Sequence, residues 1–109
     1  MFVLYILPWL TFKSISPDVI AQSEQTTVTL TFSEEISGTP YITENPVLPG
    51  PGAMTYVADG STTTFRYEYM APVSGIDSDH QLTALATDLA GNTATGLGVG
   101  NLRLSLTSD

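Results

Sequence analysis

The side chains best suited to chemistry are a group of acids around the only histidine. Asp77 and Asp79 alternate with Ser78, and His80 follows directly. Oxygen ligands at alternate positions suit a hard cation such as Ca²⁺, although the glycine and the terminal glutamate of an EF-hand loop are absent. With Asp88 as a further ligand, these residue types predict a calcium site at Asp77, Asp79 and Asp88. The simpler alternative is a solvated acidic loop.

Nucleophilic catalysis is a second chemistry to consider, because His80 has Ser78 and Asp79 close by in sequence. The roles in a catalytic triad require a held geometry and an oxyanion hole, and no strand-to-helix nucleophile elbow is visible. Glu34 and Glu35 are adjacent, so in an extended chain they point to opposite faces and do not form the carboxylate pair of a glycosidase. We therefore expect a protein that is not an enzyme.

Composition limits both the fold and the partners. With 109 residues and 42% apolar side chains, the chain is expected to form one domain with a single core. Sparse charges and abundant threonine favour strands over helices. A net charge of −8 argues against nucleic acid and against anionic membrane surfaces, since both require clustered Lys and Arg. Without cysteine there is neither a disulfide framework nor a thiolate zinc site.

Two stretches carry the clearest strand patterns. In Thr27–Phe32, apolar side chains alternate with threonines, so one face of the strand is apolar. Gln81–Thr87 places one leucine and two alanines on a shared face. Directly after it, Asp88 can accept backbone N–H groups and Gly91 can take a positive φ, which predicts a tight turn.

Turn and breaker residues divide the middle of the chain. Thr39–Thr43 is expected as an edge strand because its proline cannot donate to a ladder. Asn45–Gly52 is expected as a loop because of its prolines and glycines. The Asp-Gly-Ser turn at residues 59–61 predicts a hairpin between Met54–Ala58 and Thr62–Met70, and the aromatic row of the second arm is expected in the core.

The C-terminal third is expected to hold a loop, the Gln81 strand and a bulged strand. The loop is expected at Ala71–His80. Apolar side chains before and after Gly100-Asn101 lie at opposite parities, so both sets can face one core only if a bulge occurs there. The two sets are Leu97 and Val99 before this point, and Leu102, Leu104 and Leu106 after it.

Two motifs resemble those of a known family. The turn ATDLAGN at residues 86–92 and the strand VTLTFSEEISG at residues 28–38 are similar to the DxAGN turn and the TFSE strand end of bacterial immunoglobulin-like (Big-type) repeats. Such repeats occur in large surface proteins and adhesins, and the similarity extends from Ile15 to Leu106. The resemblance implies an all-β, immunoglobulin-like Greek-key β-sandwich of about seven strands at residues 13–109.

The resemblance also implies a function and a location. It implies a non-catalytic structural or cell-adhesion module, extracellular or on the cell surface, that serves as a spacer repeat and is stiffened by calcium in some cases. The expected partners are neighbouring immunoglobulin-like repeats or cell-surface ligands. An alternative of a different class is a glycan-binding or accessory module of a secreted enzyme, which would use Tyr41, Tyr56 or Trp9 if their rings are exposed.

The first twelve residues, Met1–Phe12, are the most apolar run in the chain. They are too few to cross a bilayer, which needs about 20 residues, and Pro8 interrupts them, so no membrane span is expected. A signal peptide cleaved after Val19-Ile20-Ala21 would lack the usual positive charge before its apolar part. The alternatives are a buried strand, the tail of a preceding repeat, and a donor strand that pairs with a sheet edge of another copy. The donor strand would make the chain a self-assembling filament subunit.

Overall fold

The computed structural model describes residues 6–50 and 54–107, and all helical or strand structure within these ranges is β-strand. No helix in the described part of the chain is long and apolar enough to cross a membrane. The strands are β1 Leu10–Ser16, β2 Val19–Ala21, β3 Gln25–Phe32, β4 Tyr41–Asn45, β5 Thr55–Val57, β6 Thr64–Met70, β7 Ser78–Thr87 and β8 Thr93–Ser105.

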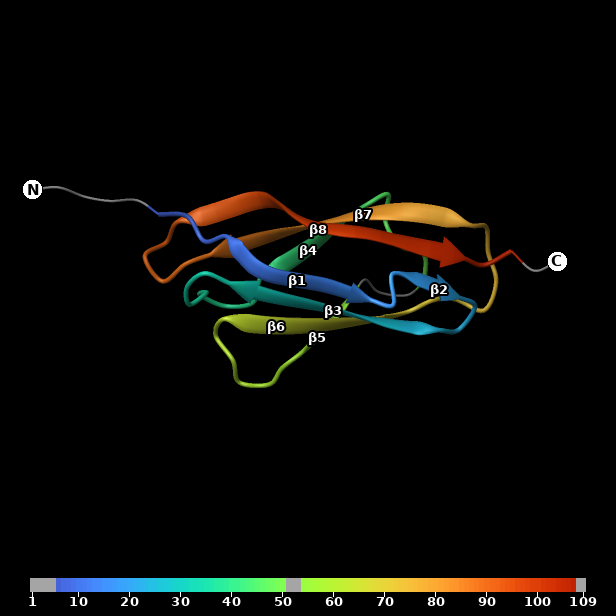
Figure 1. Ribbon diagram of the computed structural model, residues 1–109, viewed down its shortest axis with the longest axis horizontal. Coiled ribbons are helices and arrows are strands. Elements are labelled where there is room, and N and C mark those ends of the chain that lie inside the picture. Colours follow the sequence, from blue (N-terminus) through green and yellow to red (C-terminus); the bar gives the residue numbers. More distant parts are fainter. Residues whose placement is uncertain (1–5, 51–53, 108–109) are drawn as a thin grey trace, which may run out of the picture.

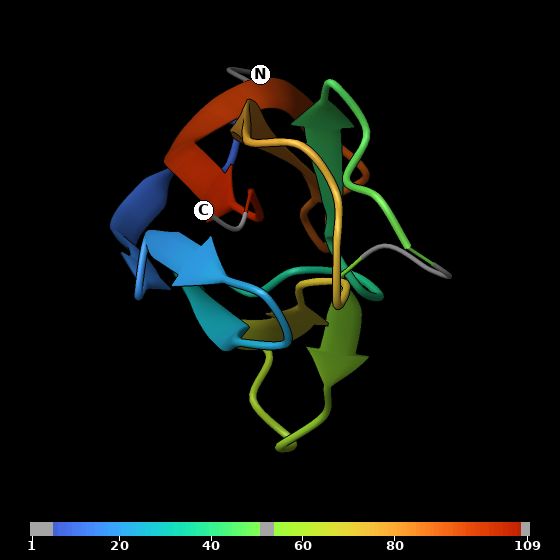
Figure 2. The same ribbon diagram turned by 90° about the vertical axis from the view of Figure 1, so that its right-hand side faces the viewer.

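The strands form two four-stranded sheets that face each other across one interior (Figures 1 and 2). One sheet has the order β1-β3-β6-β5 and the other β2-β8-β7-β4. Neighbours pair antiparallel except β2 and β8, which pair parallel. The all-β expectation is confirmed. The added strand relative to the expected seven is the three-residue β2, which follows the turn at Pro17-Asp18.

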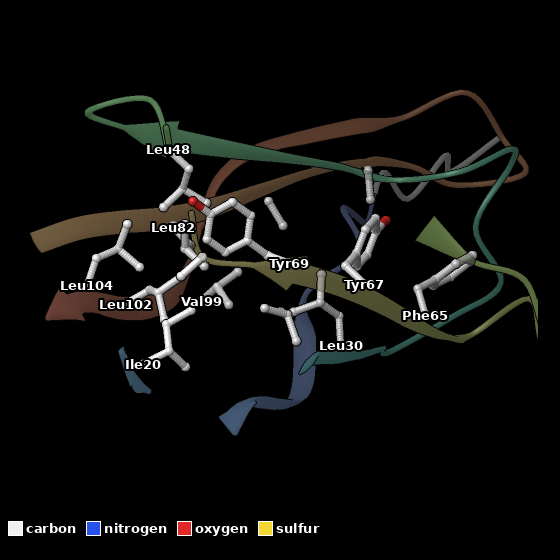
Figure 3. Close-up of a cluster of buried hydrophobic side chains, with 14 of the residues drawn as sticks. Ile20, Leu30, Leu48, Phe65, Tyr67, Tyr69, Leu82, Val99, Leu102 and Leu104 are labelled. Atoms are coloured by element: carbon white, nitrogen blue, oxygen red, sulfur yellow. The ribbon is translucent and has the colours of Figure 1, made fainter. Parts of the chain in front are cut away.

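Alternation of apolar and polar side chains decides which face of each sheet lies inside. On β3, β6 and β7 every second side chain is buried, and the side chains between them are half-buried or exposed. Burial of this kind contributes roughly 25 cal/mol for each Å² of apolar surface removed from water. The sheets therefore share one core, drawn in part in Figure 3, to which these three strands contribute Val28, Leu30, Phe32, Phe65, Tyr67, Tyr69, Leu82, Ala84 and Ala86.

The aromatic row of β6 lies in this core, as its spacing predicts. Phe65 packs edge to face against Phe32 with ring centroids 5.9 Å apart. The hydroxyl of Tyr67 donates to the carbonyl oxygen of Pro40 at 2.5 Å, and Pro40 directly precedes β4 of the other sheet. Burial, with a smaller contribution from Tyr56, raises the pKa of Tyr67. Tyr67 therefore fills the core and ties the two sheets together at the same time.

The expected bulge in the last strand is present. Leu82 pairs with Gly100 and Thr83 with Gly98, which leaves Val99 as one extra residue in β8. Gly100 has φ +145°, and a Cβ there would lie 3.2 Å from Cδ1 of Ile15 on β1. The extra residue changes the parity, so apolar side chains on both sides of it reach the core. Those buried are Val99, Leu102 and Leu104, and Leu97 is partly buried.

The loop before β7 is shorter than expected. It was expected at Ala71–His80, but its last three residues belong to β7. β7 begins at Ser78, where Ser78, Asp79 and His80 already pair with the end of β8. The polar residues at the start of this strand conceal it, because an Asp-Ser-Asp sequence is also typical of loops. The edge strand expected at Thr39–Thr43 is observed as β4, which begins after its proline and lies at the end of its sheet.

The apolar N-terminal run divides into parts with different environments. Met1–Tyr5 lie outside the described residues. Ile6, Leu7 and Trp9 are about half exposed. β1 begins at Leu10 and pairs with β3, so it crosses the boundary expected between residues 12 and 13.

A shared core predicts that removing one inward side chain weakens the whole fold. Leu30→Ala deletes a fully buried side chain and is expected to lower the free energy of unfolding by about 2–5 kcal/mol in urea denaturation. Thr29→Ala, on the opposite face of the same strand, is the matched control and is expected to cost under about 1 kcal/mol. Equal losses in the two variants would contradict the assignment of the two faces.

Candidate functional site

Loops and strand ends gather at two opposite poles of the molecule (Figure 1). The N-terminal pole is formed by residues 6–9, 33–40 and the turn at 88–92. The C-terminal pole is formed by residues 46–50, 71–77 and the end of β8. The candidate functional side chains divide between these two poles.

At the C-terminal pole, the only histidine is part of a chain of hydrogen bonds. His80 is 2% exposed, with Nδ1 2.6 Å from the carbonyl oxygen of Pro46 and Nε2 2.7 Å from Oγ of Ser78. A carbonyl oxygen only accepts, so Nδ1 carries a proton, and in the neutral ring Nε2 accepts the hydroxyl proton of Ser78. The lone pairs of Ser78 Oγ then remain available to a further donor. In a catalytic triad an acid would accept the Nδ1 proton of the histidine, whereas here the carbonyl oxygen of Pro46 does so. Asp79 is not available for this role, because it lies on the other face of β7.

Two more side chains fix the loop that follows β4. Oε1 of Glu44 accepts the N–H of Leu48 at 2.9 Å, and the hydroxyl of Tyr69 donates to the carbonyl oxygen of Pro49 at 2.8 Å. Burial and the nearby Glu44 raise the pKa of Tyr69. Oε2 of Glu44 is buried and has no hydrogen-bond partner within the described residues. Together with His80, these side chains hold residues 46–49 against the end of the core.

The fixed loop forms one wall of a pocket of about 350 Å³ at this pole. Among the described residues that line it, none is an aspartate, glutamate, lysine or arginine. The pocket has an apolar wall and two polar side chains, Ser78 and His80. Two of its apolar side chains are largely exposed, Val47 at 77% and Ile76 at 81%. Its size and its mixture of an apolar wall with a few polar groups are typical of small binding pockets. The lining includes Val47, Pro49, Ile76, Leu106, Ser78 and His80.

The two acids near His80 bind protein groups. Oδ1 of Asp77 accepts the N–H groups of Leu106 and Thr107 at 2.7 and 2.8 Å, which fixes the chain after β8. These hydrogen bonds, led by Thr107, and the nearby guanidinium of Arg103 hold the pKa of Asp77 below its ordinary value. Asp79 accepts a hydrogen bond from the same guanidinium at 3.0 Å. Both carboxylates therefore organise the C-terminal end of β8.

The third predicted ligand, Asp88, lies at the other pole. It is nine residues from Asp79 along an extended strand, which is about 30 Å. Its carboxylate accepts the backbone N–H of Asn92 at 2.8 Å and the side-chain amide at 3.3 Å, which closes the turn predicted there. Burial raises the pKa of Asp88, but hydrogen bonds from Asn92, Glu34 and Ala90 outweigh it and lower the pKa overall. Burial and the contact with Asp88 raise the pKa of Glu34.

The structure thus brings Asp77 and Asp79 to one pole and places Asp88 at the other, so these acids do not form one ligand set. Within residues 6–50 and 54–107, no three His, Cys, Asp or Glu residues are grouped to hold a metal ion. The residues that build the pocket come from separate loops and strands. Sequence reasoning missed Pro46 as the partner of His80, and it missed Glu44 and Tyr69 as side chains that fix the same loop. The sequence offered only the lone histidine as an indication.

The aromatic rings considered for glycan binding differ in exposure. Tyr41 is 72% exposed and Trp9 is 54% exposed. Tyr56 is half-buried and packs against Phe65 and Tyr67, with centroids 5.9 and 5.6 Å apart. Tyr41 and Tyr56 line a hollow of about 230 Å³ between the free edges of β4 and β5.

No protein-family model and no curated protein matches the sequence.

The lowered pKa of Asp77 predicts a pH-dependent contribution to stability. Its stabilisation is fully present above the ordinary pKa of 3.8 and is lost as the pH falls through the lower pKa of the folded state. Asp77→Asn is therefore expected to lower Tm at neutral pH, and the difference from wild type should shrink in acid. Thermal unfolding from about pH 7 to pH 2 measures this.

Asp79→Asn is the matched control. It removes the same charge only two residues away, and the side chain of Asp79 is 69% exposed. An exposed ion pair contributes little, so its effect on Tm should be small at every pH. A loss as large as that of Asp77→Asn, or an Asp77→Asn difference that persists unchanged in acid, would contradict the role given to Asp77.

Proposed function

We propose that the chain is an immunoglobulin-like Greek-key β-sandwich. The order β1-β3-β6-β5 corresponds to the ABED sheet of that fold, and β4, β7 and β8 correspond to its C, F and G strands. The connections from β3 to β4, from β4 to β5 and from β6 to β7 each cross between the sheets, as the fold requires. The short β2 corresponds to a first strand that changes sheets partway along.

We further propose a non-catalytic function as an extracellular spacer or adhesion module of a bacterial surface protein, next to similar repeats or surface ligands. The observation that carries this proposal is the pairing of β2 with β8. Val19, Ile20 and Ala21 pair in parallel with Arg103, Leu104 and Ser105, while the chain enters at one pole and leaves at the other (Figure 1). Tension between the ends would load these hydrogen bonds together in shear, which suits a load-bearing unit.

Stiffening by calcium is part of the proposal, and the geometry limits where it can act. An ion at the C-terminal pole would meet Asp77 and Asp79, and an ion at the N-terminal pole would meet Asp88 with Glu34. In either case it would have to replace hydrogen bonds that these carboxylates already make. A calcium ion would therefore bind at a joint between modules, where a neighbour supplies further oxygen ligands.

Glycan binding is a second candidate function, and one observation favours it. The ring of Tyr41 is exposed beside a hollow that it lines together with Tyr56. Stacking of an aromatic ring on a sugar requires such exposure. Loss of oligosaccharide binding on Tyr41→Ala would distinguish this function from that of a spacer.

The spacer function predicts that mechanical resistance depends on the direction of pulling. Single-molecule force spectroscopy with handles at the two chain ends is expected to give a higher unfolding force than pulling between residue 76 and the C-terminus. The second geometry peels β8 away one hydrogen bond at a time. Ile76→Cys provides the handle, because Ile76 is 81% exposed and the chain has no cysteine of its own. Equal forces in the two geometries would contradict the proposal.

The location given to calcium predicts that the isolated module responds weakly to it. Titration with calcium is expected to leave the Tm of a single module nearly unchanged and to raise the Tm of two modules joined in tandem. Asp77→Asn and Asp88→Asn, each placed in both modules, identify the pole involved. An unchanged Tm in the tandem protein would remove calcium from the proposal.

A further inference from the structure

Lys13 occupies a position where the alternation of the first sheet predicts an apolar side chain. It pairs with Leu30 on β3, and Ile15 pairs with Val28, so both β1 side chains lie on the face that points into the sandwich. Leu30 and Val28 are fully buried. Because β1 is at the edge of its sheet, this lysine, the only one in the chain, can lie on the inward face and still reach solvent.

The amine of Lys13 reaches across to the opposite sheet. Its Nζ donates to the carbonyl oxygen of Gly98 on β8 at 2.9 Å. Two residues further along β1, Cδ1 of Ile15 lies close to Gly100, where a Cβ would be 3.2 Å away from it. This part of β8 has no strand neighbour on the side of β1, because β2 pairs only with residues 103–105. The lysine therefore bridges the two sheets at a place where no ladder between described strands joins them.

The two strands that Lys13 connects are also the strands that receive tension from the chain ends. The chain enters through β1 and leaves through β8, and both strands run from the N-terminal pole to the C-terminal pole (Figure 1). Tension would therefore pull β1 and β8 in opposite directions along the long axis. From the N-terminus it would reach Lys13 before it reaches β2, whose pairing with β8 begins at Val19.

We propose that Lys13 is a strap between the two loaded strands, whose amine must leave the carbonyl oxygen of Gly98 before β1 can slide along β8. The inference rests on the proposed spacer function, and it names a side chain that resists tension in addition to the β2–β8 pairing. The hydrogen bond is exposed, so water competes with it and its contribution to equilibrium stability is small. Its loss should therefore change the unfolding rate under tension much more than it changes Tm.

Unfolding of the full chain at constant force tests the strap. Lys13→Met keeps an unbranched side chain and removes the donor. With handles at the two chain ends, it is expected to unfold about three- to tenfold faster than wild type, which corresponds to one hydrogen bond. With handles at Ile76→Cys and the C-terminus, it should unfold at the wild-type rate, because β1 is not loaded. Lys13→Arg, which keeps a charged donor, should unfold end to end like wild type.

Arg66→Met is the matched control. It also removes a positive charge from an exposed side chain, but Arg66 lies on β6, which neither chain end pulls directly, and its nearest carboxylate is that of Asp59 at 4.0 Å. It should leave both rates unchanged. A wild-type end-to-end rate for Lys13→Met, or the same acceleration in both pulling directions, would overturn the strap. The spacer function is judged separately, from the difference between the two pulling directions in the wild-type protein.

Discussion

The structure depends on burying apolar stripes from two sheets against each other while leaving almost no polar atom in the interior without a partner. The stripes come from strands whose side chains alternate, and they meet in a single core (Figure 3). Tyrosine hydroxyls that enter this core donate to carbonyl oxygens on either side of β4. The same groups that satisfy the interior therefore also fix the distance between the sheets.

The same requirement shapes the C-terminal pole. His80 and Glu44 lie on inward-facing positions, where an ionisable group is costly unless it is hydrogen-bonded. His80 and Oε1 of Glu44 meet this requirement by binding the backbone of the loop after β4, whereas Oε2 of Glu44 has no hydrogen-bond partner within the described residues. The loop is held in place as a result, and it leaves a defined pocket where the sandwich would otherwise be filled. The hydrogen bonds that satisfy these inward-facing groups therefore also shape the pocket at this pole.

Much of this architecture could be predicted from alternation alone, and the remainder shows the limits of local patterns. The inward faces of Thr27–Phe32 and Thr62–Met70, the turn at Asp88 and the bulge near Gly100 follow from side-chain periodicity and glycine. The early start of β7 at Ser78 and the short β2 could not be predicted, because their pairing with β8 involves residues far away in sequence. For the same reason the neighbours of His80 could not be predicted. The separation of Asp79 from Asp88 could have been, because an extended strand between them places them far apart.

The central claim is that both sheets share one core and unfold together, and native-state amide hydrogen exchange tests it most directly. In low denaturant, the slowest amides of β3 and β6 and those of β7 and β8 are expected to exchange with the same free energy, equal to that of global unfolding. They should also respond equally to added denaturant. Exchange of one sheet at a clearly lower free energy than the other would contradict the account, because it would mean that the slower-exchanging sheet stays folded after its partner has opened.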